Sequence, residues 1–281
     1  MTPTPSGDEA VLLLRLAGPL QAWGDRSAFN RRETRPIPTK SGVIGLLAAA
    51  AGRAREDPLD DLSHLTLGVR VDQPGTLLRD YHTVSDYRGR PLLQAGVSAK
   101  GTQKPTSPAK HTHVTTRYYL QDAVFLAAVA GPRELLLGLQ HALRNPAFPL
   151  ALGRRSCPPT QPLCLGLRET DTELALRDTP WQASRRVQDR YAGRWRRERK
   201  AERSAYPTTV PCPVTLEDPR GDDVLNDVPV SYDPLRRTFA DRRVRHDWFS
   251  VPTAFPATTG PRTTDSPEDG TGHDPFALLG W

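Results

Sequence analysis

The order of its apolar segments limits this chain to few folds. Six segments within the first 169 residues carry the apolar periodicity of a strand or of a helix. They follow one another as strand, helix, strand, strand, helix and strand, at residues 10–17, 41–52, 67–72, 118–131, 132–145 and 163–169. This order is typical of ferredoxin-like domains, a topology that many RNA-recognition modules share. We therefore predict an α+β fold with a ferredoxin-like domain over residues 8–170.

Residues 81–116 interrupt this order. They are rich in Gly, Pro, Ser, Thr, Lys and His but contain few residues that could fill a core. An unstructured connection of this length is uncommon in a compact domain. We expect a protruding hairpin or a flexible arm. The usual aromatic signature of an RNA-recognition motif is not evident in the first and third strands, so the domain is a modified form of that motif.

The pattern weakens after residue 170. Residues 171–255 contain short strands at 227–233 and 244–252 and are expected to form a smaller, β-rich C-terminal subdomain. Within them, the Arg-rich segment 185–203 has nine basic and three acidic residues. Its net charge of +6 equals that of the whole chain. Such a segment contacts nucleic acid or an acidic partner, or is a solvated helix face. Residues 256–281 are expected to form a flexible tail, because the segment is rich in Pro, Gly, Thr and acidic residues.

Arginine dominates the positive charge, with 33 of the 38 basic residues. Arginine binds phosphate through two hydrogen bonds and stacks on bases, although a GC-rich genome would also enrich it. No apolar run approaches the roughly 20 residues of a membrane span, and the first ten residues do not form a signal peptide. The three cysteines form no CxxC pair. We predict a cytoplasmic chain without a membrane partner, metal or other cofactor.

The segment PIPTKSGVIG (36–45) places Thr39, Lys40 and Ser41 at the start of a helix. Free N–H groups at a helix start, with a lysine beside them, can bind a phosphate, although Ser41 can equally act only as a cap. The preceding turn GPLQAWG contains Trp23, which either stacks on a base or fills the edge of the core.

Both ends of the arm carry residues that could bind or cleave RNA. Tyr81 and His82 lie at its start, Lys110 and His111 lie near its end, and Arg117 directly follows it. A hairpin would bring the two groups together, where they either grip RNA or act as a metal-independent endoribonuclease. A metal site at His111 and His113 is a weaker hypothesis, because no carboxylate or cysteine lies at suitable spacing nearby in the sequence.

The loop LGRRSCPPTQPL (152–163) places Arg154 and Arg155 beside a glycine, directly before the last predicted strand. Paired arginines on a loop suit phosphate binding, and loops hold functional residues more often than cores do. We favour RNA contact over a merely solvated loop.

Six blocks between residues 12 and 163 resemble, in the right order, the CasD family of the type I-E CRISPR Cascade complex. They are LRLAGPLQAWG, PTKSGVIGLLAAAAG, GVRVDQPG, LRDYHTV, YLQDAVFLAAV and LGRRSCPPTQPL. After residue 170 the resemblance is limited to places such as DVPVSYD and RRTFADRRV.

The resemblance implies a palm domain with a thumb hairpin at 81–116, which together hold the 5′ handle of the CRISPR RNA (crRNA). It also implies contacts with a backbone (CasC-type) subunit and a large (CasA-type) subunit, and with target DNA only within the assembled complex. Binding without catalysis is expected, with repeat-RNA cleavage as in type I-C relatives as the alternative. The residues expected to contact RNA are Trp23, Arg32, Arg35, Thr39, Lys40, Ser41, Tyr81, His82, Arg117, Arg154 and Arg155.

Overall fold

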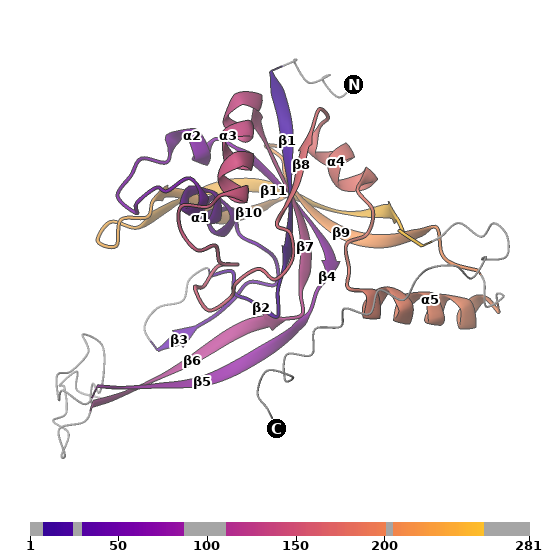
Figure 1. The fold of residues 1–281 in the computed structure, drawn as a ribbon, viewed down its shortest axis with the longest axis horizontal. Helices are drawn as coiled ribbons and strands as arrows, with labels where there is room; N and C mark the ends of the chain where they lie inside the picture. Colours follow the sequence, from indigo (N-terminus) through magenta and orange to yellow (C-terminus); the bar gives the residue numbers. More distant parts are fainter. Residues whose placement is uncertain (1–7, 25–29, 87–110, 201–204, 256–281) are drawn as a thin grey trace, which may run out of the picture.

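Two β-sheets form the frame of the protein (Figure 1). The computed structural model describes residues 8–24, 30–86, 111–200 and 205–255. The strands are β1 (Glu9–Ala17), β2 (Leu20–Gln21), β3 (Arg31–Arg32), β4 (Thr66–Gln73), β5 (Thr76–Asp86), β6 (His111–Gln121), β7 (Val124–Pro132), β8 (Cys164–Arg168), β9 (Thr209–Glu217), β10 (Asp223–Ser231) and β11 (Thr238–Pro252). The helices are α1 (Lys40–Ala50), α2 (Asp60–Ser63), α3 (Arg133–Arg144), α4 (Thr172–Asp178) and α5 (Arg185–Arg199).

The larger sheet has seven strands in the order β10-β11-β9-β4-β7-β1-β8, and all its neighbouring strands are antiparallel. The predicted α+β class with an antiparallel sheet is confirmed. The six apolar segments correspond to β1, α1, β4, β7, α3 and β8. The predicted helix stop is also present, because Gly52 follows α1 with a φ of 77°, a conformation that favours glycine.

The predicted strand 118–131 is in fact two strands in different sheets. Residues up to Gln121 belong to β6 in the smaller sheet, and residues from Val124 belong to β7 in the larger one. Asp122 lies between them with a φ of 55°, which aspartate tolerates better than most residues. The apolar pattern runs through this corner because Tyr119 and Leu120 at the end of β6 are buried as β7 is, so the pattern alone could not locate it.

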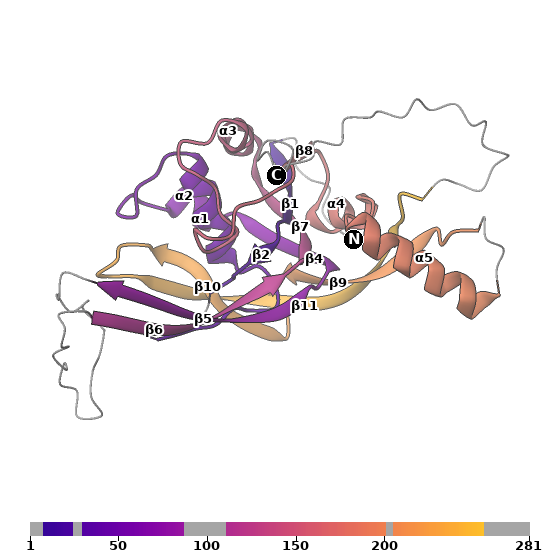
Figure 2. The same cartoon turned by 60° about the horizontal axis from the view of Figure 1, so that its bottom comes forward.

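The predicted arm begins as a β-hairpin. β5 and β6 pair in antiparallel register from Thr76 opposite Gln121 to Asp86 opposite His111. In Figure 1 the paired strands run away from the helices and the larger sheet, whereas in Figure 2 the ends of β10 and β11 reach about as far as they do. Residues 87–110 lie outside the described residues, and so does the predicted tail 256–281.

Residues 171–255 do not form a separate β-rich subdomain. β9 pairs with β4 along Gly68 to Arg70, and β11 and β10 continue the same sheet. Without β9, the outer edge of β4 would have unpaired backbone groups, which sheets normally cover. The C-terminal strands therefore complete the sheet that the first half of the chain begins.

Helices cover both faces of the larger sheet (Figure 1). Leu12 and Leu14 of β1 belong to the core under α1 and α3, whereas Val11 and Leu13 belong to the core under α4 and α5. A strand buried on both faces explains the continuous apolar run at the start of the chain. Within the described ranges, no helix is long and apolar enough to cross a membrane.

A buried cluster of four charged side chains joins the start of α1 to the C-terminal strands. The ammonium of Lys40 lies 2.9 Å from the Glu217 carboxylate of β9. Arg242 of β11 lies 2.6 Å from Asp227 of β10, and Asp227 also accepts the backbone N–H of Lys40 at 2.7 Å. We call these four residues the α1 charge cluster. Its charges are mutually paired, as buried charges must be.

Replacing Asp227 with alanine should lower the free energy of unfolding of the protein. Arg242 would lose its closest carboxylate and the Lys40 N–H its acceptor, and removing one partner of a buried ion pair costs about 3–5 kcal/mol. Urea unfolding of the full chain measures this loss. Asp222→Ala is the matched control, because Asp222 is exposed near the same strand. Equal stability of the two variants would contradict the structural role of the cluster.

Candidate nucleic-acid interface

A groove at the base of the β5–β6 hairpin brings together several predicted residues. The groove has a volume of about 430 Å³. This is within the range of pockets that hold small ligands, about 300–1,000 Å³, so one nucleotide is a ligand of suitable size. Its lining combines cationic, anionic and apolar groups, from Leu20, Leu78, Arg79, Asp80, His82, Arg117, Tyr119 and Ser156.

Strand alternation explains which side chains reach the groove. Asp80 and His82 are two positions apart on β5 and therefore lie on the same face of the hairpin. Asp80 lies directly opposite Arg117 of β6, and His82 lies opposite Thr115. On the other edge of β6, Arg32 of β3 pairs with Arg117 in parallel register. The predicted residues Arg32, His82 and Arg117 are thus neighbours on one face.

Arg154 fastens the 152–163 loop to this hairpin. Its guanidinium donates to the backbone carbonyl of Tyr118 at 2.8 Å and to that of Glu33 at 2.9 Å, and it lies 4.9 Å from the ring centre of Tyr119. Arg154 therefore positions the wall of the groove as well as adding positive charge. Its neighbour Arg155 is exposed and has no protein partner among the described residues.

The turn that presents Arg154 requires a glycine. Gly153 has a φ of 87°, and a Cβ there would lie 1.8 Å from the carbonyl oxygen of Ala22. This close approach accompanies a hydrogen bond of 3.1 Å from the Ala22 N–H to the Leu152 carbonyl. Cys157 completes the turn and is fully buried, and burial raises the pKa of its thiol. Cys157 therefore supports the loop and is not placed as a nucleophile.

The start of α1 is not an open phosphate site, contrary to the prediction. Thr39, Lys40 and Ser41 are all buried. The Thr39 hydroxyl caps the helix by accepting the Gly42 N–H at 3.2 Å, so the cap is Thr39 and not Ser41. Lys40 is paired with Glu217, and the Asp227 carboxylate occupies the place expected for a phosphate.

Trp23 fills the core and does not offer a surface for base stacking. Its side chain is fully buried, and its Nε1–H donates to the Gln21 side chain at 3.1 Å. A Cβ on Gly42 would lie 2.6 Å from the Trp23 ring, so Gly42 makes room for tryptophan rather than for phosphate. Arg35 is half-buried, and its N–H donates to the Trp23 carbonyl at 2.7 Å.

Tyr81 and His82 lie on opposite faces of the hairpin because they are consecutive residues of one strand. Tyr81 is 67% exposed on the face away from the groove. His82 lies on the groove face, with its Nδ1 3.6 Å from a carboxylate oxygen of Asp80. The two side chains do not converge on one phosphodiester, which removes the simplest arrangement for RNA cleavage by this pair. Lys110 and the side chains of His111 and His113 lie outside the described part of the chain.

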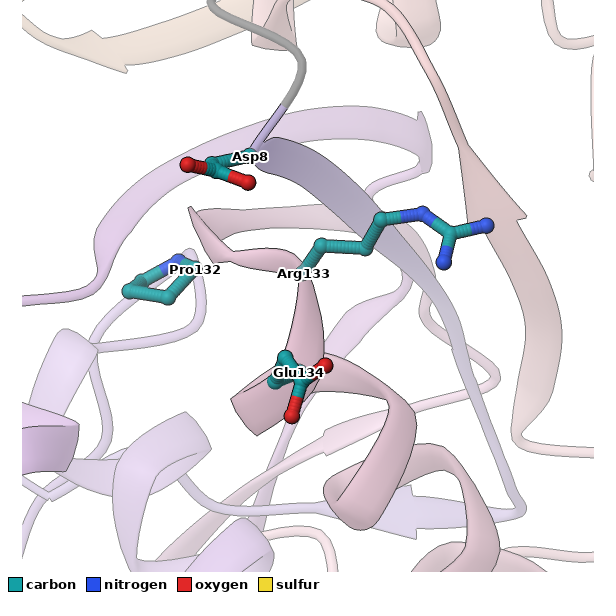
Figure 3. Close-up of a pocket in the computed structure, with 4 residues that line it drawn as sticks. All are labelled: Asp8, Pro132, Arg133 and Glu134. Carbon is teal, nitrogen blue, oxygen red and sulfur yellow. The ribbon is translucent and has the colours of Figure 1, made fainter.

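A second pocket lies at the start of β1 and α3 and has no comparable arrangement. Asp8, Pro132, Arg133 and Glu134 line it, and the three charged side chains point in different directions (Figure 3). Arg133 instead pairs with Glu169 at 3.1 Å. Among the described residues, no group of three or more His, Cys, Asp or Glu side chains is placed to hold a metal ion.

Tyr119 is the main groove residue that sequence reasoning missed. It was assigned only to the core of a strand, and it is indeed 4% exposed. Its position two residues after Arg117 on a strand places both side chains on one face, which was the available signal. Leu20 and Ser156 carried no such signal, because their place in the groove depends on packing between distant segments.

Comparison with known proteins links this fold to CRISPR-associated proteins. A family model described as "CRISPR-associated protein (Cas_Cas5)" matches residues 11–245. The "CRISPR system Cascade subunit CasD" of Escherichia coli (strain K12) is 38% identical over 186 residues, a match that covers 59% of this chain and 75% of that relative.

Two solved structures are similar over most of the chain. One, described as "CRISPR RNA-guided surveillance complex", has a TM-score of 0.63 and 35% identity, and the match covers 86% of this chain and 91% of that chain. The other, described as "Crystal structure of Cas protein", has a TM-score of 0.60 and 35% identity, with 88% and 100% covered. The mixed α and β architecture with antiparallel sheets is therefore shared with these proteins.

Gly153→Ala should destabilise the protein, because the new methyl group would meet the Ala22 carbonyl in a strained backbone conformation. A residue held in such a conformation costs about 1–3 kcal/mol. Gly138→Ala on α3 should act in the opposite direction, since nothing lies within 4 Å of its Cβ position and alanine favours a helix. Thermal unfolding of both variants compares them. A Gly153→Ala protein as stable as the parent would contradict the close contact.

Proposed function

The chain belongs to the Cas5 family of CRISPR-associated proteins, and we propose that it is the type I-E Cascade subunit that holds the crRNA 5′ handle. The observation that supports this most is the groove at the base of the hairpin. It places Arg117, with Arg32 beside it, next to the apolar side chains of Leu20 and Leu78. Cations that neutralise phosphates beside apolar groups that contact bases suit a single-stranded RNA end.

We further interpret the strands β4-β7-β1-β8 as a ferredoxin-like palm and the β5–β6 hairpin as its thumb. The chain order β1, α1, β4, β7, α3, β8 and the antiparallel pairing support this interpretation. In this arrangement the proposed RNA site lies where the thumb leaves the palm, and β2 and β3 connect the two by pairing with β6.

The residues predicted to contact RNA fall into three groups. Arg32, Tyr81, His82, Arg117 and Arg155 contact the RNA, the cations through phosphates and Tyr81 by stacking on the outer face of the hairpin. Arg154 and Arg35 hold the surrounding segments in place through the backbone hydrogen bonds described above. Trp23, Thr39, Lys40 and Ser41 act only in packing and capping.

We also propose that the protein works in the cytoplasm as part of a ribonucleoprotein complex. A backbone (CasC-type) subunit and a large (CasA-type) subunit are the proposed protein partners, and target DNA is met only within the assembled complex. Similarity to a Cascade subunit and to an RNA-guided surveillance complex supports this assignment. We propose binding without RNA cleavage, because Tyr81 and His82 point to opposite faces of the hairpin.

Arg32→Gln combined with Arg117→Gln, two neighbouring cations on the groove face, should weaken binding of a repeat-derived 5′-handle RNA. Each lost phosphate contact to a single strand should reduce the steepness of log K against log salt by about 0.7. Fluorescence anisotropy over a salt series measures both effects. Arg55→Gln with Arg144→Gln removes the same charge from exposed positions outside the groove lining and should bind as the parent does. Equal losses in the two double variants would contradict a site in the groove.

Repeat RNA incubated with the purified chain in EDTA should remain intact, and His82→Ala should behave as the parent does. Denaturing gel electrophoresis of end-labelled RNA detects any cut. Cleavage at one position by the parent that His82→Ala abolishes would establish the endoribonuclease alternative and overturn binding without turnover.

A further inference from the structure

Helix α5 has two different faces. Its inner face packs on the protein, where Ala192 is fully buried and Val187 and Tyr191 contact the core under α4 and α5. The Tyr191 ring lies 5.4 Å from that of Trp181 in an edge-on arrangement. This apolar face is already covered, so it is not available to insert into a membrane or to enter a partner's apolar groove.

The outer face carries a row of arginines. Arg186, Arg190 and Arg197 stand at positions i, i+4 and i+11, which coincide on one stripe of a helix with 3.6 residues per turn. All three are exposed, and their guanidinium groups have no hydrogen bond or ion pair within the described part of the chain. By contrast, Arg185 is paired with Asp189 and Arg194 with Glu198 along the same helix.

The composition of this row favours phosphates over bases as its ligand. Single-stranded nucleic acid is usually bound by exposed aromatic rings. Here the aromatic rings of α5 lie away from the row, because Tyr191 packs inward and Trp195, nine residues after Arg186, stands on the opposite side of the helix. Arginine can reach a guanine edge in the major groove, but the row has no amide or hydroxyl side chain that could read the other bases or a ribose 2′-OH.

A rigid row of guanidinium groups suits the backbone of a duplex. Arg186 and Arg197 are separated by about 16 Å along the helix axis. Duplex DNA carries one negative charge per about 1.7 Å of its axis, so several phosphates fall within this span. Gly193 lies within the row, where a Cβ would meet only the Arg197 guanidinium at 3.6 Å. Packing does not require this glycine, which disfavours a helix but lets a ligand approach the backbone closely.

We infer that the outer face of α5 binds the phosphate backbone of double-stranded DNA without reading its sequence, and that this surface meets target DNA once the chain is part of the assembled complex. In both views α5 and the outer end of the β5–β6 hairpin lie on opposite sides of the molecule (Figures 1 and 2), while Ser184 at the start of α5 donates to the Gln73 side chain just before β5. No α5 residue lines the hairpin groove, so the DNA surface and the RNA groove use different side chains.

The test compares two triple variants of the full chain. Arg186→Gln, Arg190→Gln and Arg197→Gln remove the row, whereas Arg55→Gln, Arg144→Gln and Arg220→Gln remove the same charge from exposed positions elsewhere. A labelled 30-base-pair DNA duplex is the probe, and anisotropy is measured over a salt series. The α5 variant should bind at least about tenfold more weakly near 0.1 M salt, with a salt slope smaller by about 2.7, because each duplex phosphate contact contributes about 0.9. The control variant should bind as the parent does.

Further arms identify the ligand. Handle RNA should bind the α5 variant as it binds the parent, and polyglutamate should not compete with the duplex at equal charge. Gly193→Leu should leave the melting temperature within a few degrees and weaken duplex binding severalfold. Equal loss in both triple variants, tighter binding of an RNA duplex than of DNA, or effective competition by polyglutamate would each overturn a DNA-backbone surface.

Discussion

The pairing of Lys40 with Glu217 inside the protein, together with Asp227 and Arg242, is the interaction on which the rest of the structure depends. Charges can be buried only if they find partners, so these four side chains fix the start of α1 against three C-terminal strands at once. The same pairing satisfies the N–H group and the cation that could otherwise bind a phosphate. The first helix is thereby committed to joining the two halves of the chain, and RNA has to be bound elsewhere.

The second sheet supplies that place. β6 pairs with β5 along one edge and with β2 and β3 along the other, so the hairpin is fixed to the segment that precedes α1. Arg154 adds the loop before β8 through two backbone carbonyls and the ring of Tyr119. Segments far apart in the sequence thus form one groove, whose cations stand on a rigid base. Such a base limits the entropy lost on binding, which favours recognition of a fixed RNA end.

Local patterns predicted what is determined locally. The apolar segments and the helix end at Gly52 follow from periodicity and a turn residue, and they are present in the structure. The arm was expected as a hairpin or a flexible segment, and its described part is a hairpin. Local patterns gave wrong predictions where a residue distant in the sequence determines how a side chain or strand is placed. The phosphate site expected at Lys40 is filled by carboxylates on strands far along the chain, and Trp23 is buried because Gly42 leaves space above it. The C-terminal strands were predicted to form a separate subdomain because β4, the strand with which β9 pairs, lies more than 130 residues earlier.

Crosslinking tests the central proposal, that the hairpin groove holds the RNA end, more directly than any other measurement. A 5′-handle RNA containing 4-thiouridine is bound to the full chain, irradiated, and the crosslinked peptides are identified by mass spectrometry. A site in the groove predicts crosslinks on β5, on β6 and on the loop 152–163. Crosslinks concentrated on α5, or on the α3 side of the larger sheet, with none on the hairpin would contradict it.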